Sequence, residues 1–170
     1  MLDASLAELQ AALAAKKVSS VELTRAFHAR IRKLDGTLNA FVGLDEETSL
    51  AQARASDARR ARGGAGPLEG IPIAHKDIFC TRDLLTTCGS RMLASYRSPY
   101  DAHVIERFAE AGPGLPGQTN LGEVALGSSH GTSHFGPGHN PPGRDLGPGG
   151  ASGGSGGGGA GRAAAGGPRP

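Results

Sequence analysis

One lysine lies in a segment whose other residues are mostly apolar. Residues 70–79 read G-I-P-I-A-H-K-D-I-F and place His75 and Lys76 among branched apolar side chains. The run 71–74, bounded by Gly and Pro, predicts a short strand that is buried on both faces. Burial disfavours the ammonium form, and a neutral lysine is a base that can activate a nucleophile. The alternative is that Lys76 lies at the strand end and reaches water along its aliphatic stem.

A second segment, residues 148–155, reads P-G-G-A-S-G-G-S and crowds glycines around small hydroxyl side chains. This composition lets backbone N–H groups approach a substrate closely and form an anion-binding nest. Flexible linkers have the same composition, so the segment alone is also typical of a linker.

Together, the G-I-P-I-x-x-K-D segment and the Gly/Ser run resemble the amidase signature family, whose active site is a nucleophilic serine, a second serine in a cis peptide and a lysine. Within that family, the stretch between them is similar to the A subunits of the tRNA-dependent glutamyl amidotransferases. The resemblance is close up to Ala111 and patchy from there to Ser155. Further segments carry it: T-T-C-G-S at 86–90, S-P-Y-D-A at 98–102, T-N at 119–120, L-G-S-S at 126–129, F-G-P at 135–137 and N-P at 140–141.

The resemblance assigns roles to single residues. Lys76 matches the family's lysine, the base that accepts a proton relayed from the nucleophile. The cis-serine position is Ala151, which has no hydroxyl and can neither relay a proton nor donate a hydrogen bond. Ser152 follows one residue later and could substitute only if the local backbone shifted. The family's nucleophile lies further along, in a D-T-G-G-S type segment that the chain does not reach before Pro170, so the nucleophile is expected to be absent and the chain inactive.

Two serines and one histidine have weaker assignments. Ser128 and Ser129 match a family loop near the glutamine pocket, which implies substrate binding, although a turn-forming role fits them equally well. His75 is interpreted mainly as a neighbour of the site that packs or hydrogen-bonds locally. Asn120 and Glu123 keep part of a T-N-x-x-E pattern, but the family's preceding lysine is Gln118 here and its following phenylalanine is Val124.

No metal site is expected. His130, His134 and His139 are spaced irregularly, and their Gly/Pro-rich setting cannot hold three imidazoles in a fixed geometry. Cys80 and Cys88 fit neither a zinc site nor a disulfide framework, and are expected to be reduced thiols of a cytoplasmic protein.

The resemblance implies a glutamine amide hydrolase that supplies ammonia for converting Glu-tRNA(Gln) to Gln-tRNA(Gln). Its partners would be B and C subunits in a heterotrimer and Glu-tRNA(Gln). ATP and Mg²⁺ would act on the partner B subunit, with no cofactor on this chain. Two alternatives remain open: another amidase-signature hydrolase acting on a small amide, and a remnant without enzymatic activity.

Composition divides the chain after Ala111. Of the 28 Gly and 11 Pro, 21 Gly and 8 Pro fall in residues 112–170, which predicts a segment that cannot bury enough apolar surface to offset its ordering entropy. We therefore expect an amidase-type part at 1–111 and a degraded or disordered continuation at 112–170. Residues 156–170 contain only Gly, Ala, Arg and Pro, as a shifted reading frame in a GC-rich gene would produce, and a natural flexible linker is the alternative. The net charge of +2, with one basic run at 59–62, indicates no nucleic-acid footprint. The sequence shows neither a membrane-spanning apolar run nor a signal peptide.

The order of elements predicts an α/β fold: the N-terminal portion of the amidase-signature α/β/α architecture, a mixed sheet flanked by helices, incomplete and followed by an irregular Gly/Pro-rich segment. Capping patterns predict helices from Ser5 to about Ala15 and from Ser19 to Gly36. Further expected elements are a strand at 38–42, a helix from Asp45 to about Arg62, the strand at 71–74 and a helix from Asp101 to Gly112. Two prolines in 113–116 argue against a strand there.

Overall fold

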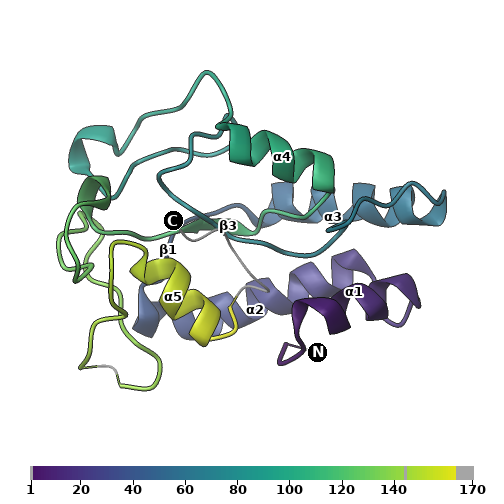
Figure 1. The fold of residues 1–170 in the computed structure, drawn as a ribbon, viewed down its shortest axis with the longest axis horizontal. Coiled ribbons are helices and arrows are strands. Elements are labelled where there is room, and N and C mark those ends of the chain that lie inside the picture. The colour runs from purple at the N-terminus through teal and green to yellow at the C-terminus, as the bar shows by residue number, and fades with distance from the viewer. Residues whose placement is uncertain (1, 144, 164–170) are drawn as a thin grey trace.

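The structure, a computed structural model, describes residues 2–143 and 145–163 of the chain. The described residues form a mixed α/β fold with a small mixed sheet, as the sequence predicts. The elements in chain order are α1 (Leu6–Ala14), α2 (Ser20–Leu38), β1 (Phe41–Leu44), α3 (Glu46–Ala61), β2 (His75–Lys76), α4 (His103–Ala111), β3 (Gly117–Thr119) and α5 (Gly153–Ala160). In Figure 1, α4 lies on one side of the strands, and α1, α2 and α5 lie on the other.

The first two helices begin where the capping patterns place them. The Ser5 hydroxyl accepts the Glu8 N–H at 3.3 Å, and the Ser19 hydroxyl accepts the Glu22 N–H at 3.1 Å, each within a complete capping box. The predicted end of α2 at Gly36 is wrong, because the helix continues to Leu38 and ends at Asn39 in the left-handed conformation.

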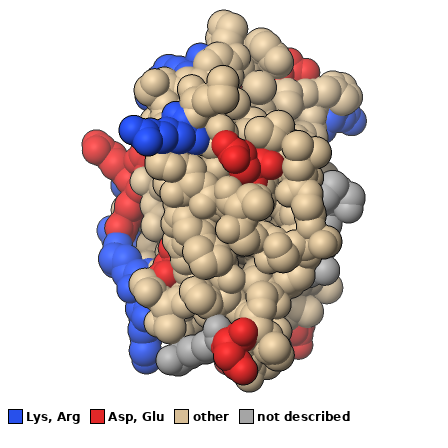
Figure 2. Space-filling view, turned by 90° about the vertical axis from the view of Figure 1, so that its left-hand side faces the viewer, with Lys and Arg blue, Asp and Glu red and all other residues tan. Residues whose placement is uncertain are grey.

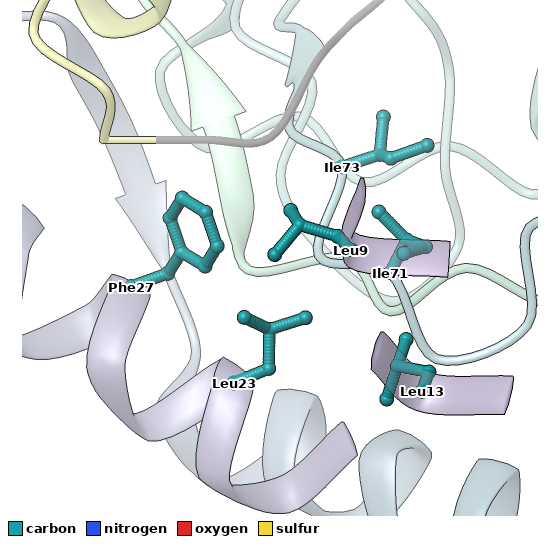
Figure 3. Close-up of a cluster of buried hydrophobic side chains, with 6 residues drawn as sticks. All are labelled: Leu9, Leu13, Leu23, Phe27, Ile71 and Ile73. Atoms are coloured by element: carbon teal, nitrogen blue, oxygen red, sulfur yellow. The ribbon is translucent and has the colours of Figure 1, made fainter. Parts of the chain in front are cut away.

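The first hydrophobic core joins the N-terminal helices to the segment that leads into β2. Its buried side chains come from α1, α2 and residues 71–73, and they lie near one another in Figure 3. The members are Leu9, Leu13, Leu23, Phe27, Ile71 and Ile73. Burial of such side chains is the main stabilising contribution to a fold of this size, and here it fixes the chain just before Lys76.

The sheet has the strand order β1-β3-β2, with β1 antiparallel and β2 parallel to β3. The strand predicted at 38–42 lies at 41–44, because α2 extends to Leu38. The strand predicted at 71–74 is instead a buried segment with one bridge, between Pro72 and Gly114, and the regular strand is His75–Lys76. Pro72 has no N–H to donate, which limits regular pairing at that point.

Strand β3 begins directly after the two prolines. The doubt about a strand at 113–116 is confirmed, since only Gly114 makes a bridge there and the paired residues are 117–119. β3 nevertheless occupies the middle of the sheet. The central strand therefore comes from the Gly/Pro-rich part of the chain.

The last two predicted helices have different outcomes at their N-termini. α3 begins after Asp45, whose carboxylate accepts the Thr48 N–H at 2.9 Å, as predicted. The prediction that Asp101 caps α4 is wrong: the N-cap is Ala102, without a side-chain bond. Asp101 instead accepts the Arg82 N–H at 2.8 Å and forms an ion pair with its guanidinium. The predicted stop at Gly112 is confirmed, with φ of 84°.

Two arginines of the basic run at 59–62 have structural partners. Arg59 of the basic run forms an ion pair with the buried Glu69 at 2.7 Å, and Arg60 donates to the Glu69 carbonyl, so two of its arginines hold α3 to the following loop. The face drawn in Figure 2 is mostly uncharged, with single basic and acidic groups spread over it. Among the described residues, no helix is long and apolar enough to cross a membrane.

Candidate functional site

Lys76 lies within β2 and is 2% exposed. Its backbone pairs with Thr119 of β3, and its neighbours His75 and Asp77 are both fully buried. Burial lowers the pKa of Lys76 from its ordinary value. The alternative in which this lysine reaches water is therefore wrong, and the amine lies in the kind of environment that favours its basic, neutral form.

The Gly/Ser run meets Lys76 directly. Lys76 Nζ donates to Ser152 Oγ at 2.8 Å, and Ser152 is the N-cap residue of α5. Because α5 contacts both β2 and β3, two segments 76 residues apart in the chain form one site. Ala151 occupies the position of the family's cis-serine and adds no hydroxyl to this site. The described residues contain no cis peptide bond.

Glycines allow α5 to lie this close to the sheet. A Cβ on Gly154 would lie 2.3 Å from the Asn120 carbonyl oxygen and 2.5 Å from the Asn120 nitrogen. Gly154 also donates its N–H to that carbonyl at 3.0 Å. One residue along, the hydroxyl groups of Ser155 and Thr119 lie 2.8 Å apart. The absence of side chains in this part of the run thus positions the hydroxyl of Ser152.

His130 lies beside the same helix start, a placement that the sequence does not predict. It is 2% exposed, and a Cβ on Gly153 would lie 1.9 Å from its Nδ1, so its ring lies against the backbone next to Ser152. Burial, and then the charge of Lys76, lower the pKa of His130. Neither ring nitrogen has a hydrogen-bond partner among the described residues.

His75 packs into the core of the sheet. Burial lowers its pKa from 6.5 to about 4, so the ring is neutral near pH 7. Within residues 2–143 and 145–163, its two ring nitrogens have no hydrogen-bond partner. The interpretation of His75 as a packing neighbour of the site agrees with this position, and the structure shows no local hydrogen bond for its ring within the described range.

Asp77 ties the T-T-C-G-S loop to the strand that carries Lys76. The Thr87 N–H donates to Asp77 Oδ1 at 2.9 Å, and the Thr87 hydroxyl donates to Oδ2. Burial raises the pKa of Asp77 from 3.8 to about 6, while the Thr87 bonds act in the opposite direction. No sequence pattern assigned a role to Asp77, although a carboxylate next to a buried lysine is a signal that could have found it.

Ser128 and Ser129 are exposed and lie in the loop that adjoins the Gly/Ser run. The Ser128 carbonyl accepts the Gly150 N–H at 2.7 Å, and the Ser129 hydroxyl accepts the Gly131 N–H at 3.4 Å. The first bond brings the loop next to the segment that contains Ser152, and the second is a turn contact. Substrate binding by these serines stays a prediction.

The remaining polar residues of this region have structural partners. Asn120 is fully buried, and its side chain bonds the Asn39 and Gly136 carbonyls at 3.0 and 3.1 Å. Glu123 accepts the Ser90 hydroxyl at 2.7 Å. The His134 ring meets Phe135 edge-on, with centroids 5.2 Å apart. In the described part of the chain, no group of three or more His, Cys, Asp or Glu side chains could hold a metal ion.

The sequence is similar to known proteins over most of its length. The profile of the family described as Amidase matches residues 22–167. The chain is 57% identical over 152 residues to the A subunit of the glutamyl-tRNA(Gln) amidotransferase of Aromatoleum aromaticum, and 59% identical over 153 residues to that of Dechloromonas aromatica. These matches cover 89% of this chain but 31% and 32% of the relatives, so the chain spans about a third of their length.

Solved structures show the same fold over a comparable portion. A peptide amidase from Stenotrophomonas maltophilia matches with a TM-score of 0.83 and 36% identity, over 90% of this chain and 33% of that one. The glutamyl-tRNA(Gln) amidotransferase A subunit of Thermotoga maritima matches with a TM-score of 0.75 and 33% identity, over 95% of this chain and 32% of that one. A protein from a complex related to an s-triazine catabolic enzyme matches with a TM-score of 0.90 and 33% identity, over 95% of this chain and 36% of that one. With a family profile that covers most of its residues and this agreement in fold, the chain belongs to the amidase family.

Proposed function

We propose that these residues are the lysine-bearing part of an A subunit of a glutamine-dependent Glu-tRNA(Gln) amidotransferase. The observation that carries the proposal is the buried Lys76 amine, hydrogen-bonded at 2.8 Å to a serine of the Gly/Ser run. The sequence relatives with this name are 57% and 59% identical to the chain, whereas the structurally similar peptide amidase is 36% identical.

In the whole protein, Lys76 would act as the base. A neutral amine can accept the proton that leaves a serine nucleophile when it attacks the glutamine amide, and can return a proton to the departing ammonia. The ammonia would then convert Glu-tRNA(Gln) to Gln-tRNA(Gln) with a B subunit that uses ATP and Mg²⁺, braced by a C subunit. Ser128 and Ser129 would lie near the glutamine pocket, and the heterotrimer would be cytoplasmic.

The 170-residue polypeptide itself should not hydrolyse glutamine. Ala151 offers no hydroxyl for the relay, and the 170 residues contain no D-T-G-G-S segment. Ammonia release from glutamine should equal that of the Lys76→Ala variant, which serves as the matched background. Release clearly above that background would contradict this part of the proposal.

The second candidate is a hydrolase of other small amides, which the higher TM-score of 0.83 to the peptide amidase favours over the 0.75 to the amidotransferase. A chimera separates the two. Residues 22–111 of this chain would replace the matching segment of the Aromatoleum aromaticum protein, expressed with its partner subunits. We expect glutamine-dependent formation of Gln-tRNA(Gln), and a loss of about a thousandfold or more with Lys76→Ala.

The controls for the chimera separate assembly from chemistry. Lys33→Ala, at an exposed position on α2, should leave the activity unchanged. Co-purification with the B and C subunits should persist in the Lys76→Ala chimera. A chimera that assembles but releases ammonia only from other amides would favour the second candidate, and one that neither assembles nor hydrolyses any amide would favour a remnant without activity.

A further inference from the structure

Ser152 is the hydrogen-bond partner of Lys76 Nζ within the described residues, and no carboxylate there forms an ion pair with that amine. A buried ammonium without a counter-charge is costly, so the site favours the neutral amine. A neutral amine at the same 2.8 Å separation can exchange roles with the serine and accept the Ser152 hydroxyl proton. Lys76 is 2% exposed, so water has little access to the amine, whereas Ser152 is partly exposed.

The surroundings of the Ser152 hydroxyl favour negative charge. Ser152 is the N-cap of the eight-residue α5, and the first N–H groups of a helix point out of its N-terminus with a partial positive charge. The ring of His130 lies against Gly153 at the same place, buried, with neither nitrogen bonded in the described part of the chain. An unpartnered imidazole N–H at this depth can donate to a group that binds beside Ser152.

We propose that Ser152 is a nucleophile that Lys76 activates directly, in a site for acyl and phosphoryl donors whose leaving group departs as a stable anion. With a fluorophosphonate, the Ser152 Oγ–P bond forms while the P–F bond breaks. Fluoride leaves with the electron pair of that bond, and the hydroxyl proton passes to Lys76 Nζ. The first-turn N–H groups of α5 and the His130 ring stabilise the charge that develops on the phosphoryl oxygen.

This reactivity is a property of the 170 residues themselves and is distinct from glutamine hydrolysis. An amide nitrogen must be protonated before it leaves, and Ala151 supplies no hydroxyl to relay that proton. Fluoride and aryloxide anions need no such proton. Ser152 is therefore expected to react with activated acyl and phosphoryl donors, while Lys76 and Ser152 together leave unactivated amides intact.

The test is labelling of the full chain with a fluorophosphonate, followed by peptide mass spectrometry. We expect one adduct, on Ser152, absent from Ser152→Ala and retained in Ser155→Ala. Ser155 belongs to the same helix, but its hydroxyl meets Thr119 of β3, whereas Lys76 Nζ bonds Ser152. Lys76→Met, which keeps an apolar stem and removes the amine, should slow labelling at least about tenfold. Far-UV circular dichroism of each variant shows whether the helices persist.

The pH profile of the unmodified chain gives a second readout that does not depend on any variant. The labelling rate should rise with pH and level off below the ordinary lysine value of 10.5, since the pKa of Lys76 is lowered. An unchanged labelling rate in Ser152→Ala would overturn the proposal. So would labelling of Ser152 no faster than that of the other serines, or a profile without a plateau below 10.5.

Discussion

At the scale of single residues, Lys76 meets Ser152 at the start of α5, and the His130 ring lies beside them. An apolar segment that contains a lysine indicates burial, and the structure confirms it at 2% exposure. Ser152 was expected to approach the site only after a backbone shift, whereas it bonds Lys76 at 2.8 Å. His130 was grouped with two other histidines by spacing alone. A long-range contact that passes through a loop leaves no periodic signal in the sequence, so neither partner could be placed in advance.

Two neighbouring groups on β2 respond to pH in opposite directions. The folded state holds the proton of Asp77 more tightly than the unfolded chain, with a pKa of about 6 against 3.8, so its contribution to stability falls as pH rises from about 4 to 6. The folded state binds a proton on His75 more weakly, with a pKa of about 4 against 6.5, so stability rises as pH rises from about 4 to 6.5. Each group changes the free energy of unfolding by roughly 3 kcal/mol over its pH range, and the two changes largely cancel.

Asp77→Asn should make the His75 effect visible. Between pH 4 and 6.5, we expect the free energy of unfolding of this variant to rise by about 3 kcal/mol more than that of the parent chain, because only the parent loses the Asp77 contribution. Urea titrations followed by far-UV circular dichroism at several pH values measure both. Asp83→Asn, at an exposed position, is the control and should follow the parent. Parallel curves for Asp77→Asn and the parent would contradict the assignment.

At the scale of elements, local signals predicted the helices and failed for the strands and for α5. Capping patterns located the N-termini of α1, α2 and α3, because a cap is decided by residues three positions apart. The strands are only two to four residues long and depend on pairing with β3, which no local pattern reveals. Six of the eight residues of α5 are glycine, so its propensity opposes the helix, and only tertiary contact explains it.

Two glycines of α5 should respond oppositely to alanine. Gly154→Ala would put a Cβ 2.3 Å from the Asn120 carbonyl oxygen. It should destabilise the packing of α5 on the sheet by about 1–3 kcal/mol. Gly156→Ala meets only an ordinary 3.7 Å contact with the Pro148 carbonyl and should stabilise the helix by about 1 kcal/mol. Amide hydrogen exchange within α5 measures both changes. Equal effects of the two substitutions would show that α5 does not pack on the sheet as described.

At the scale of the whole molecule, composition divides the chain after Ala111, yet the sheet crosses that position. β3 follows it and lies between β1 and β2, which precede it. Gly117 makes this possible, since a Cβ there would lie 2.3 Å from the Gly43 carbonyl. Composition reports the entropy that ordering costs but not the close contacts that only glycine permits. A disordered continuation after Ala111 remains a proposal about the chain in solution.

The environment of Lys76 depends on this assembly as a whole, because β3 pairs with its strand and α5 brings Ser152 to its amine. Titration of the Lys76 side-chain nitrogen by NMR, in the native chain and in concentrated urea, tests the central claim most directly. Lys76→Arg, which lacks the lysine signal, assigns the resonance. We expect a pKa below the ordinary 10.5 in the native chain and a return to that value in urea. A native pKa at or above 10.5 would show that Lys76 is not the buried base of an amidase site.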